Sequence, residues 1–135
     1  MNVFVDTSAF CAVIDADDSR HHDTLVTWER LLGNRDARPT TGYALVETTS
    51  LLQNRIGFDA VWTLAAYVLP IVTIAWVDEG MHRSAFHALL VSGRKRLSLV
   101  DCVSFEAMSR MGIENVLCFD PHFTEQGFRV HPPVG

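Results

Sequence analysis

The sequence predicts an α/β fold in which helices cover both faces of a parallel sheet of short strands. Short apolar runs, such as Val3–Val5 and Asn115–Phe119, alternate along the chain with amphipathic segments of helical length. This alternation is typical of parallel sheets, because two parallel strands need a long crossover connection that is usually a helix. Right-handed crossovers then place the carboxyl ends of the strands at one edge, where open α/β sheets bind ligands.

Polar turns and capping residues mark the first helices. Thr7–Ile14 follows the first strand at a polar turn and is expected to be a short helix. Ser19 is the expected N-cap of a second helix, which runs to Leu32 and ends at a Gly-Asn pair. Arg38–Thr41 is interpreted as a brief edge-type strand or turn, because Pro39 cannot donate to a ladder.

Glycine and proline delimit the middle of the chain. Tyr43–Arg55 is expected to be helical, with its leucines on one side, and Gly57 ends it. The next helix is expected over Asp59–Leu69, and it stops before Pro70 because proline breaks a helix. Ile71–Trp76 follows as a second buried strand.

Two helices and two strands are expected in the last part of the chain. Asp78 or Glu79 begins a helix that runs to Ser92, where a glycine follows. Leu99–Met111 is expected to be the next helix, again followed by glycine. The closing strands are expected over Asn115–Phe119 and Phe128–His131.

The overall composition and length predict one domain, residues 1–135, with part of its surface buried against a partner. A hydrophobic content of 48% and a mean hydropathy of +0.14 are high for a monomer and indicate a partner surface. The formal net charge of −5 argues against binding nucleic-acid duplex by charge alone. No apolar run reaches the roughly 18 residues of a membrane span, no signal peptide is visible, and three unpatterned cysteines favour a reducing cytoplasm.

Four acids stand where an open sheet would gather its ligands. Asp6, Asp101 and Asp120 lie at borders between apolar runs and helix starts, and each taken singly is interpreted as a helix cap. Glu47 is almost the only charge in its helix, which indicates that it points into a site. Carboxylates brought together repel each other and favour divalent cations. The remaining acids, Asp18 among them, are interpreted as surface residues or caps.

Two weaker candidates accompany the acids. Ser104 lies one helical turn after Asp101, so it either orients a carboxylate or a water, or bonds back to its own helix. The basic run Arg94, Lys95 and Arg96 is either a solvated helix end or a phosphate contact for RNA. The six histidines have no metal-binding spacing and are interpreted as surface or core residues.

The order of the motifs resembles the PIN domain family, and more narrowly the VapC-type toxins of toxin–antitoxin pairs. The resemblance rests on Val-Asp-Thr-Ser-Ala, a helical Glu, Leu-Ser-Leu-Val-Asp-Cys-Val-Ser and Cys-Phe-Asp-Pro-His-Phe, and it covers nearly the whole chain. It implies a PIN-like three-layer α/β/α fold with a central, mainly parallel, short-stranded sheet. It also implies an endoribonuclease that depends on Mg²⁺ or Mn²⁺ and leaves 5′-phosphate and 3′-hydroxyl products.

The resemblance assigns roles to individual residues. The acidic quartet of the family falls on Asp6, Glu47, Asp101 and Asp120, and the accessory hydroxyl that follows the first Asp falls on Thr7 or Ser8. Many relatives have Thr two residues before the last Asp, whereas this chain has Cys118, so a hydroxyl contact to the site is lost.

The chemistry expected of the quartet is hydrolysis by a metal-activated water. Asp6 and Asp101 are the first choice as direct metal ligands, while Glu47 and Asp120 bind a second ion or act through water. Family members are held inactive by a small antitoxin whose peptide lies across the active-site groove, and they commonly form homodimers. The expected partners are therefore an antitoxin, an RNA substrate and a second copy.

Four alternatives compete with a toxin nuclease. A catalytically silent PIN-like binding module and a PIN nuclease of general RNA processing share the fold. A phosphoacceptor of the response-regulator type needs a late Lys, and none follows Lys95. A phosphatase of the haloacid-dehalogenase type needs Asp-x-Asp at the first strand, and position 8 is Ser.

Overall fold

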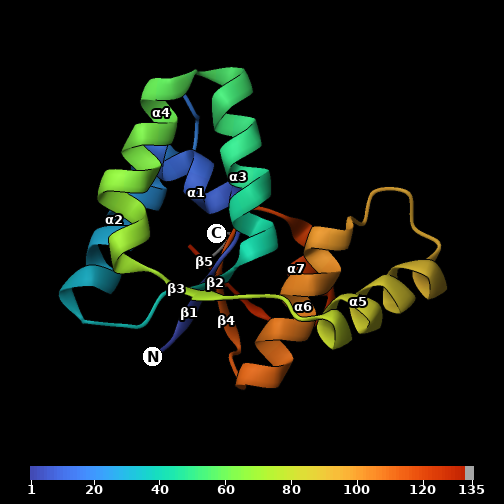
Figure 1. Cartoon of the computed structure of the whole chain (residues 1–135). Coiled ribbons are helices and arrows are strands. Elements are labelled where there is room, and N and C mark those ends of the chain that lie inside the picture. The colour runs from blue at the N-terminus through green and yellow to red at the C-terminus, as the bar shows by residue number, and fades with distance from the viewer. Residues whose placement is uncertain (133–135) are drawn as a thin grey trace.

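Five short parallel strands lie at the centre of the computed structural model, which describes residues 1–132 (Figure 1). They are β1 (Val3–Val5), β2 (Pro39–Thr41), β3 (Thr73–Ala75), β4 (Asn115–Leu117) and β5 (Arg129–His131). One ladder runs β1-β4-β5 and the other pairs β2 with β3. The Thr40 hydroxyl joins them by donating a hydrogen bond of 2.8 Å to the carbonyl of Val5. The spatial order is therefore β3-β2-β1-β4-β5.

Helices cover both faces of these strands, as the sequence predicts. They are α1 (Thr7–Ile14), α2 (His21–Gly33), α3 (Gly42–Arg55), α4 (Phe58–Thr63), α5 (Glu79–Ser92), α6 (Leu99–Met111) and α7 (Pro121–Glu125). Figure 1 shows α1 to α4 on one side of the strands and α5 to α7 on the other. The predicted α/β/α fold with a short-stranded parallel sheet is thus confirmed.

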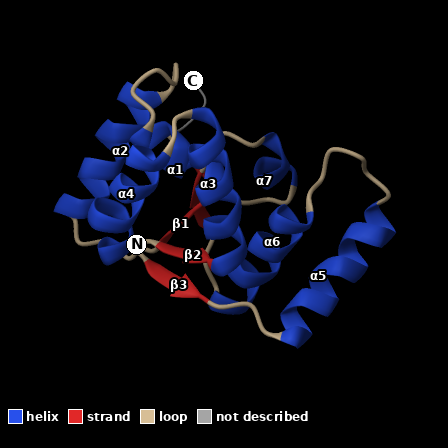
Figure 2. Cartoon of the chain, turned by 45° about the horizontal axis from the view of Figure 1, so that its top comes forward, coloured by secondary structure: helices blue, strands red, loops and turns tan. Residues whose placement is uncertain are grey.

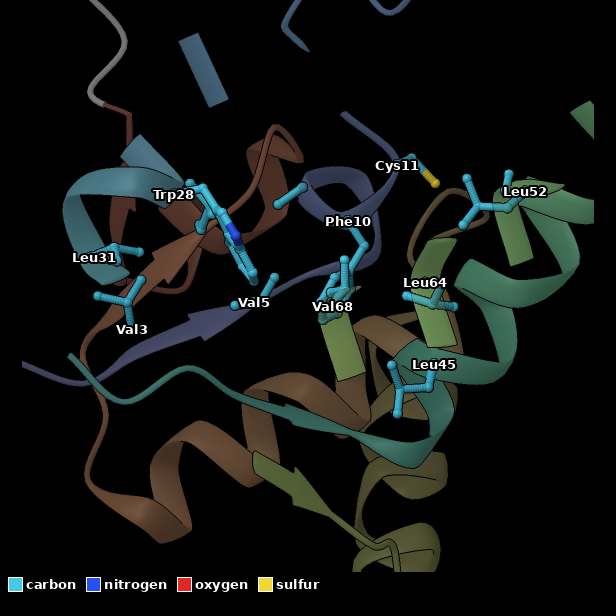
Figure 3. Close-up of a cluster of buried hydrophobic side chains, with 13 residues drawn as sticks. Val3, Val5, Phe10, Cys11, Trp28, Leu31, Leu45, Leu52, Leu64 and Val68 are labelled. Atoms are coloured by element: carbon cyan, nitrogen blue, oxygen red, sulfur yellow. The ribbon is translucent and has the colours of Figure 1, made fainter. Parts of the chain in front are cut away.

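Successive residues of β1 supply two separate cores, because side chains alternate across a strand. Val3 and Val5 pack with Phe10, Trp28 and Leu31 and with residues of α3 and α4 (Figure 3). The rings of Phe10 and Trp28 meet edge to face, with centroids 6.4 Å apart, which is a favourable aromatic arrangement.

The second core lies beneath α5, α6 and α7. Phe4 points into it with Val116 of β4, Met108 of α6 and Phe123 of α7. Phe105 meets Phe123 edge to face at 4.9 Å between centroids. Because α6 and α7 are fixed on this core, their first residues are held at the carboxyl end of the strands.

Several predicted boundaries are wrong for physical reasons. Ser19 does not cap α2: Arg20 holds the N-cap position, without a side-chain cap bond. The strand expected over Ile71–Trp76 is only Thr73–Ala75, and it is partly exposed because it lies at the end of the strand order. The Pro39–Thr41 strand is fully buried, because it lies between β1 and β3.

The helix expected over Asp59–Leu69 is irregular. Six residues of α4 pass into a π-helical turn, Leu64–Val68, and a 3₁₀ turn, Leu69–Ile71. Pro70 has no amide hydrogen, so a regular helix cannot continue through it. Among residues 1–132, none of the helices combines the length and apolarity that a membrane crossing requires.

Helix starts surround the carboxyl ends of β1 and β4. The amide of Asp6 donates to the Leu117 carbonyl at 3.1 Å, so the chain leaves both strands at the same level. From there, one residue separates β1 from α1, and three residues separate β4 from α7. Figure 2 shows α3 and α6 side by side beyond the strands. This edge of the sheet is where the predicted site residues meet.

Candidate active site

A cavity of about 220 Å³ opens at the carboxyl ends of β1 and β4. All four predicted acids line it: Asp6, Glu47, Asp101 and Asp120. They come from the end of β1, from α3, from the first turn of α6 and from the segment after β4. The fold therefore brings together carboxylates that are far apart in the sequence.

Asp6 is the most buried of these acids, with an exposed fraction of 4%. It is the N-cap of α1, and its Oδ2 accepts hydrogen bonds from the amide and the hydroxyl of Ser8, at 3.4 and 2.9 Å. Burial raises the pKa of Asp6 to about 7, against the lowering effect of Ser8, and the charge of Asp101 raises it further. A bound cation would stabilise the ionised form of a buried carboxylate whose pKa has been raised in this way.

The two hydroxyl residues after Asp6 have different partners. Ser8 accepts a hydrogen bond of 3.0 Å from the amide of Phe119 while it donates to Asp6. Thr7 lines the cavity, but its hydroxyl donates to the carbonyl of Ala44 in α3 at 3.1 Å. Ser8 is therefore the residue that supports the Asp6 carboxylate.

Asp101 lies at the third position of α6, and Ser98 is the N-cap. Each side chain accepts a hydrogen bond from the other residue's amide, so the pair forms a capping box. Burial raises the pKa of Asp101 to about 6, and the charge of Asp120 raises it in the same direction, against the hydrogen bonds from Ser98. The prediction that Asp101 is the helix cap is therefore wrong, whereas its predicted position at the start of the helix is confirmed.

Asp120 caps α7 and lies against a histidine. Its Oδ1 accepts a hydrogen bond of 2.9 Å from the His122 amide and lies 2.8 Å from the ring Nδ1. The same Nδ1 lies 3.7 Å from Oδ2 of Asp101. This buried nitrogen has no well-oriented hydrogen bond within residues 1–132, although two carboxylates surround it.

These donor atoms fit a metal ion. One atom each from Asp101, Asp120 and His122 lies within 4.8 Å of the others. Ligand atoms about 2.1 Å from an octahedral ion lie roughly 3 Å apart when adjacent and about 4.2 Å apart when opposite. The 2.8 and 3.7 Å separations fall near that range. His122, which was interpreted from the sequence as a surface or core residue, lies beside two of the acids.

Glu47 projects from the face of α3 that it shares with Leu51 and Arg55. These residues are four apart, which places them on one helical face, and all three line the cavity. Glu47 also borders an apolar pocket with Val46 and Val100. The α3 face thus joins the acidic cavity to an apolar surface.

A cationic group occupies another part of the cavity lining. Asp18 accepts hydrogen bonds from the amide and Nε of Arg20, at 2.8 and 3.3 Å. The guanidinium carbon of Arg20 lies 4.4 Å from the centroid of the Phe119 ring. Asp18 was interpreted as a surface residue, and Arg20 and Arg55 were missed. The i, i+4, i+8 spacing of Glu47, Leu51 and Arg55 was the available signal.

The other predicted residues lie outside this lining. Ser104 is fully buried, and its hydroxyl has no hydrogen-bond partner within residues 1–132. Arg94 donates to Glu125 at 2.7 Å, and Lys95 and Arg96 are not part of the lining. Cys118 Sγ lies 3.8 Å from the Asp120 carbonyl, and burial raises the pKa of this thiol above its usual range. The thiol therefore packs beneath Asp120 and does not face the cavity.

The chain is similar in sequence to a characterised endonuclease. It is 32% identical over 127 residues to the 23S rRNA-specific endonuclease VapC20 of Mycobacterium tuberculosis, covering 93% of this chain and 95% of that protein. The crystal structure of VapC20, described as a sarcin–ricin loop cleaving toxin, superposes with a TM-score of 0.82 over 94% of this chain and 96% of that one. No protein-family model matches the chain.

Two more distant structures share the fold. FitAcB from Neisseria gonorrhoeae has a TM-score of 0.69 at 12% identity, over 95% of each chain. VapBC2 from Rickettsia felis, bound to a DNA fragment from its promoter, has a TM-score of 0.70 at 11% identity, over 97% of this chain and 98% of that chain. At such identities the likeness concerns the fold alone.

Proposed function

The chain belongs to the VapC family of PIN-domain endoribonucleases, the toxins of type II toxin–antitoxin systems, and we propose that Asp6 and Asp101 hold the Mg²⁺ or Mn²⁺ on which its activity depends. One observation carries this proposal. Burial raises the pKa of Asp6 to about 7 and of Asp101 to about 6, although both line a cavity open to solvent. Burial disfavours the ionised form of both carboxylates, and a cation bound between them would stabilise that form.

The remaining donors complete the proposed site. Asp120 and the ring nitrogen of His122 would contribute further ligands, and Glu47 would bind a second ion or act through water. A bound divalent cation supplies a water of lowered pKa for in-line attack on a phosphodiester. Ser8 holds the Asp6 carboxylate in place, and the capping box holds Asp101.

RNA is the proposed substrate, and 23S rRNA is the proposed target. The support is the 32% identity to a 23S rRNA-specific endonuclease along nearly the full length of both chains. The base contacts that would choose a cleavage position depend on loops around the cavity. The roles of Thr7, Ser104 and the Arg94–Arg96 run in RNA cleavage stay predictions.

An antitoxin is the proposed protein partner, and the apolar face beside α3 is where it would bind. Val46 and Trp76 are 68% and 73% exposed, and both line a groove that Gly42 and Leu69 complete. Val46 also borders the pocket that contains Glu47, so the apolar face continues to the acids. A peptide on this face could place a basic side chain among the carboxylates.

The other proposals concern assembly and location. The exposed apolar side chains also suit a homodimer. Three buried free cysteines, Cys11, Cys102 and Cys118, suit the reducing cytoplasm. We also propose that residues 1–135 form a single PIN-like domain, because both cores share β1.

Cleavage by Asp6→Asn tests the proposed function. This variant keeps a similar shape and removes the negative charge. We expect it to retain the fold and to lose metal-dependent cutting of a labelled RNA by a factor of at least about 100. EDTA should stop the parent protein to the same degree. Undiminished cutting of RNA by Asp6→Asn would falsify the assignment of Asp6. A parent protein that neither cuts RNA nor gives a heat of Mn²⁺ binding would be a silent binding module.

A further inference from the structure

We propose that Arg20 and Arg55 form a binding site for RNA backbone phosphates at the Asp18 end of the cavity. This inference rests on the proposed function, because it assigns a substrate-binding role within the same cavity. Its basis is the lining itself: Arg20 and Arg55 are the only cationic side chains that line the acidic cavity within residues 1–132.

Charge balance explains why such a site is needed. The protein carries a formal net charge of −5, and the carboxylates in this cavity repel a polyanion. A bound cation would offset the charge at the scissile phosphate, but it would not hold the phosphates on either side. Affinity for nucleic acid comes mostly from arginine and lysine contacts to phosphates. Cationic side chains in the cavity lining would supply such contacts.

The contacts of Arg20 fix its guanidinium group and leave its two terminal nitrogens available to bind a phosphate. Its Nε donates to Asp18 at 3.3 Å, and its guanidinium carbon lies 4.4 Å from the Phe119 ring centroid. These contacts use one nitrogen and one face of the guanidinium. The two terminal nitrogens make no hydrogen bond to any of residues 1–132. They form the planar donor pair that binds a phosphate through two oxygens.

Arg55 approaches the same region from α3. Its side chain lines the cavity and has no ion pair or hydrogen bond within residues 1–132. It lies eight residues after Glu47 on one helical face, roughly 12 Å along the axis. That spacing places Arg55 about two helical turns from Glu47, so we expect it to bind a neighbouring phosphate rather than the scissile one.

Asp18 pairs with Arg20 and lines the same cavity as Arg55. Partial burial alone would raise its pKa, but hydrogen bonds from Arg20, together with the charges of Arg20 and Arg55, hold the pKa of Asp18 below its ordinary value. Both guanidinium groups therefore favour the charged form of the same carboxylate, and both side chains line the same cavity as Asp18. A phosphate beside that carboxylate would have cationic groups from α3 and from the start of α2.

A purely structural role makes a different prediction. The Asp18–Arg20 contact lies in the turn before α2, so it could serve only to fix that turn. In that case Arg20→Gln would lower the melting temperature, and RNA affinity would change no more than in a control. Arg55 is exposed in the last turn of α3 and supports no packing, so Arg55→Gln separates the two roles.

The test measures binding of a fluorescein-labelled RNA hairpin by anisotropy over a series of salt concentrations. An Asp6→Asn background prevents cleavage during the measurement. We expect Arg20→Gln and Arg55→Gln each to weaken binding about ten- to a hundredfold, and to reduce the slope of log affinity against log salt by about 0.7. Arg83→Gln is the matched control, because Arg83 is exposed on α5 and pairs with Glu79.

Two further measurements keep the result decisive. Arg20→Lys retains the charge and loses the planar donor pair, so its affinity should lie between those of the parent and Arg20→Gln. Heats of Mn²⁺ binding, measured with Asp6 intact, should be the same in both arginine variants and the parent. If Arg20→Gln fails to fold, Arg20→Lys and Arg55→Gln give the answer.

RNA affinity and salt slope equal to those of Arg83→Gln in both variants would overturn the phosphate site. Failure of the proposed function is a separate outcome. It would appear as a parent protein without Mn²⁺ binding or metal-dependent cutting, whatever the arginine variants do to RNA affinity.

Discussion

The hydroxyl of Ser8 donates a hydrogen bond of 2.9 Å to Oδ2 of Asp6. The Ser8 hydroxyl oxygen itself accepts a hydrogen bond of 3.0 Å from the amide of Phe119, which follows β4. Ser8 thus fixes the most buried acid of the cavity and connects it to the segment that carries Asp120. A single hydroxyl therefore sets the position of two parts of the proposed metal site.

Ser8→Ala should weaken metal binding without unfolding the protein. The substitution removes the hydrogen bond that lowers the pKa of Asp6, so the carboxylate would hold its proton to higher pH. Outer-shell changes of this kind cost about tenfold or more in metal affinity. Calorimetric titration with Mn²⁺ measures it. Ser84→Ala, an exposed serine on α5, is the control, and equal Mn²⁺ affinity in the two variants would contradict this role for Ser8.

The metal-free protein should lose stability as the pH rises from about 4 to about 7. The folded protein holds protons on Asp6 and Asp101 up to pKa values of about 7 and about 6, whereas the unfolded chain releases them near 3.8. The folded state binds more protons in this window, so its stability falls with rising pH. Asp6→Asn should remove much of this dependence and melt several degrees above the parent at about pH 8.

Thermal melting in EDTA at several pH values checks this effect. The relevant quantity is the melting temperature of the parent minus that of Asp6→Asn, because other ionisable groups cancel in the difference. Saturating Mn²⁺ should reverse the sign of the difference near neutrality, since only the parent gains the full binding free energy. A difference that stays constant with pH would show that Asp6 ionises normally.

His122→Ala should weaken Mn²⁺ binding more than Mg²⁺ binding. The His122 Nδ1 lies 2.8 Å from Asp120 and 3.7 Å from Asp101, where a shared ion would contact all three. Mg²⁺ prefers oxygen ligands, whereas Mn²⁺ accepts imidazole more readily. We expect about a tenfold loss for Mn²⁺ and a smaller one for Mg²⁺. Titration calorimetry with both ions measures these losses, and exposed His87→Ala is the control. Affinities equal to those of His87→Ala would place His122 outside the ligand set.

Trp76→Ala should reduce antitoxin binding and leave RNA cleavage unchanged. The Trp76 ring is 73% exposed and lies on Gly42, where an added Cβ would come within 2.6 Å of it. Exposed tryptophans at the centre of an interface commonly contribute enough that truncation costs at least about tenfold in affinity. Surface plasmon resonance with the antitoxin measures this loss. Tyr67→Ala, 76% exposed on the Leu64–Val68 turn, is the control, and equal affinities would move the interface elsewhere.

Local sequence patterns predicted most elements correctly. Leu99–Met111 and Thr7–Ile14 have the predicted bounds, because a cap and a glycine or a polar turn delimit each helix. The cap of α6 was nevertheless misplaced: both Ser98 and Asp101 are good N-cap residues, and only the backbone shows which one precedes the helix. The exposure of Thr73–Ala75 was missed because an edge strand and a central strand have similar apolar composition.

The cavity lining was predicted only in part. Strand ends and helix starts predicted where Asp6, Asp101 and Asp120 lie, because parallel topology gathers those positions. Arg20 and His122 could not be found in this way. Arg20 stands in a turn and reaches the cavity by stacking on Phe119, whereas His122 lies against Asp120 and Asp101 because of the short turn that Asp120 caps. Such contacts depend on tertiary packing that local patterns do not encode.

A crystal soaked in Mn²⁺ at a pH above 7, where Asp6 and Asp101 are ionised, gives the most direct measurement. Anomalous scattering locates the manganese independently of any activity. The predicted result is a peak within bonding distance of carboxylate oxygens of Asp6 and Asp101, inside the cavity at the ends of β1 and β4. Density for manganese only elsewhere on the surface, with those carboxylates uncoordinated, would contradict the metal-dependent mechanism.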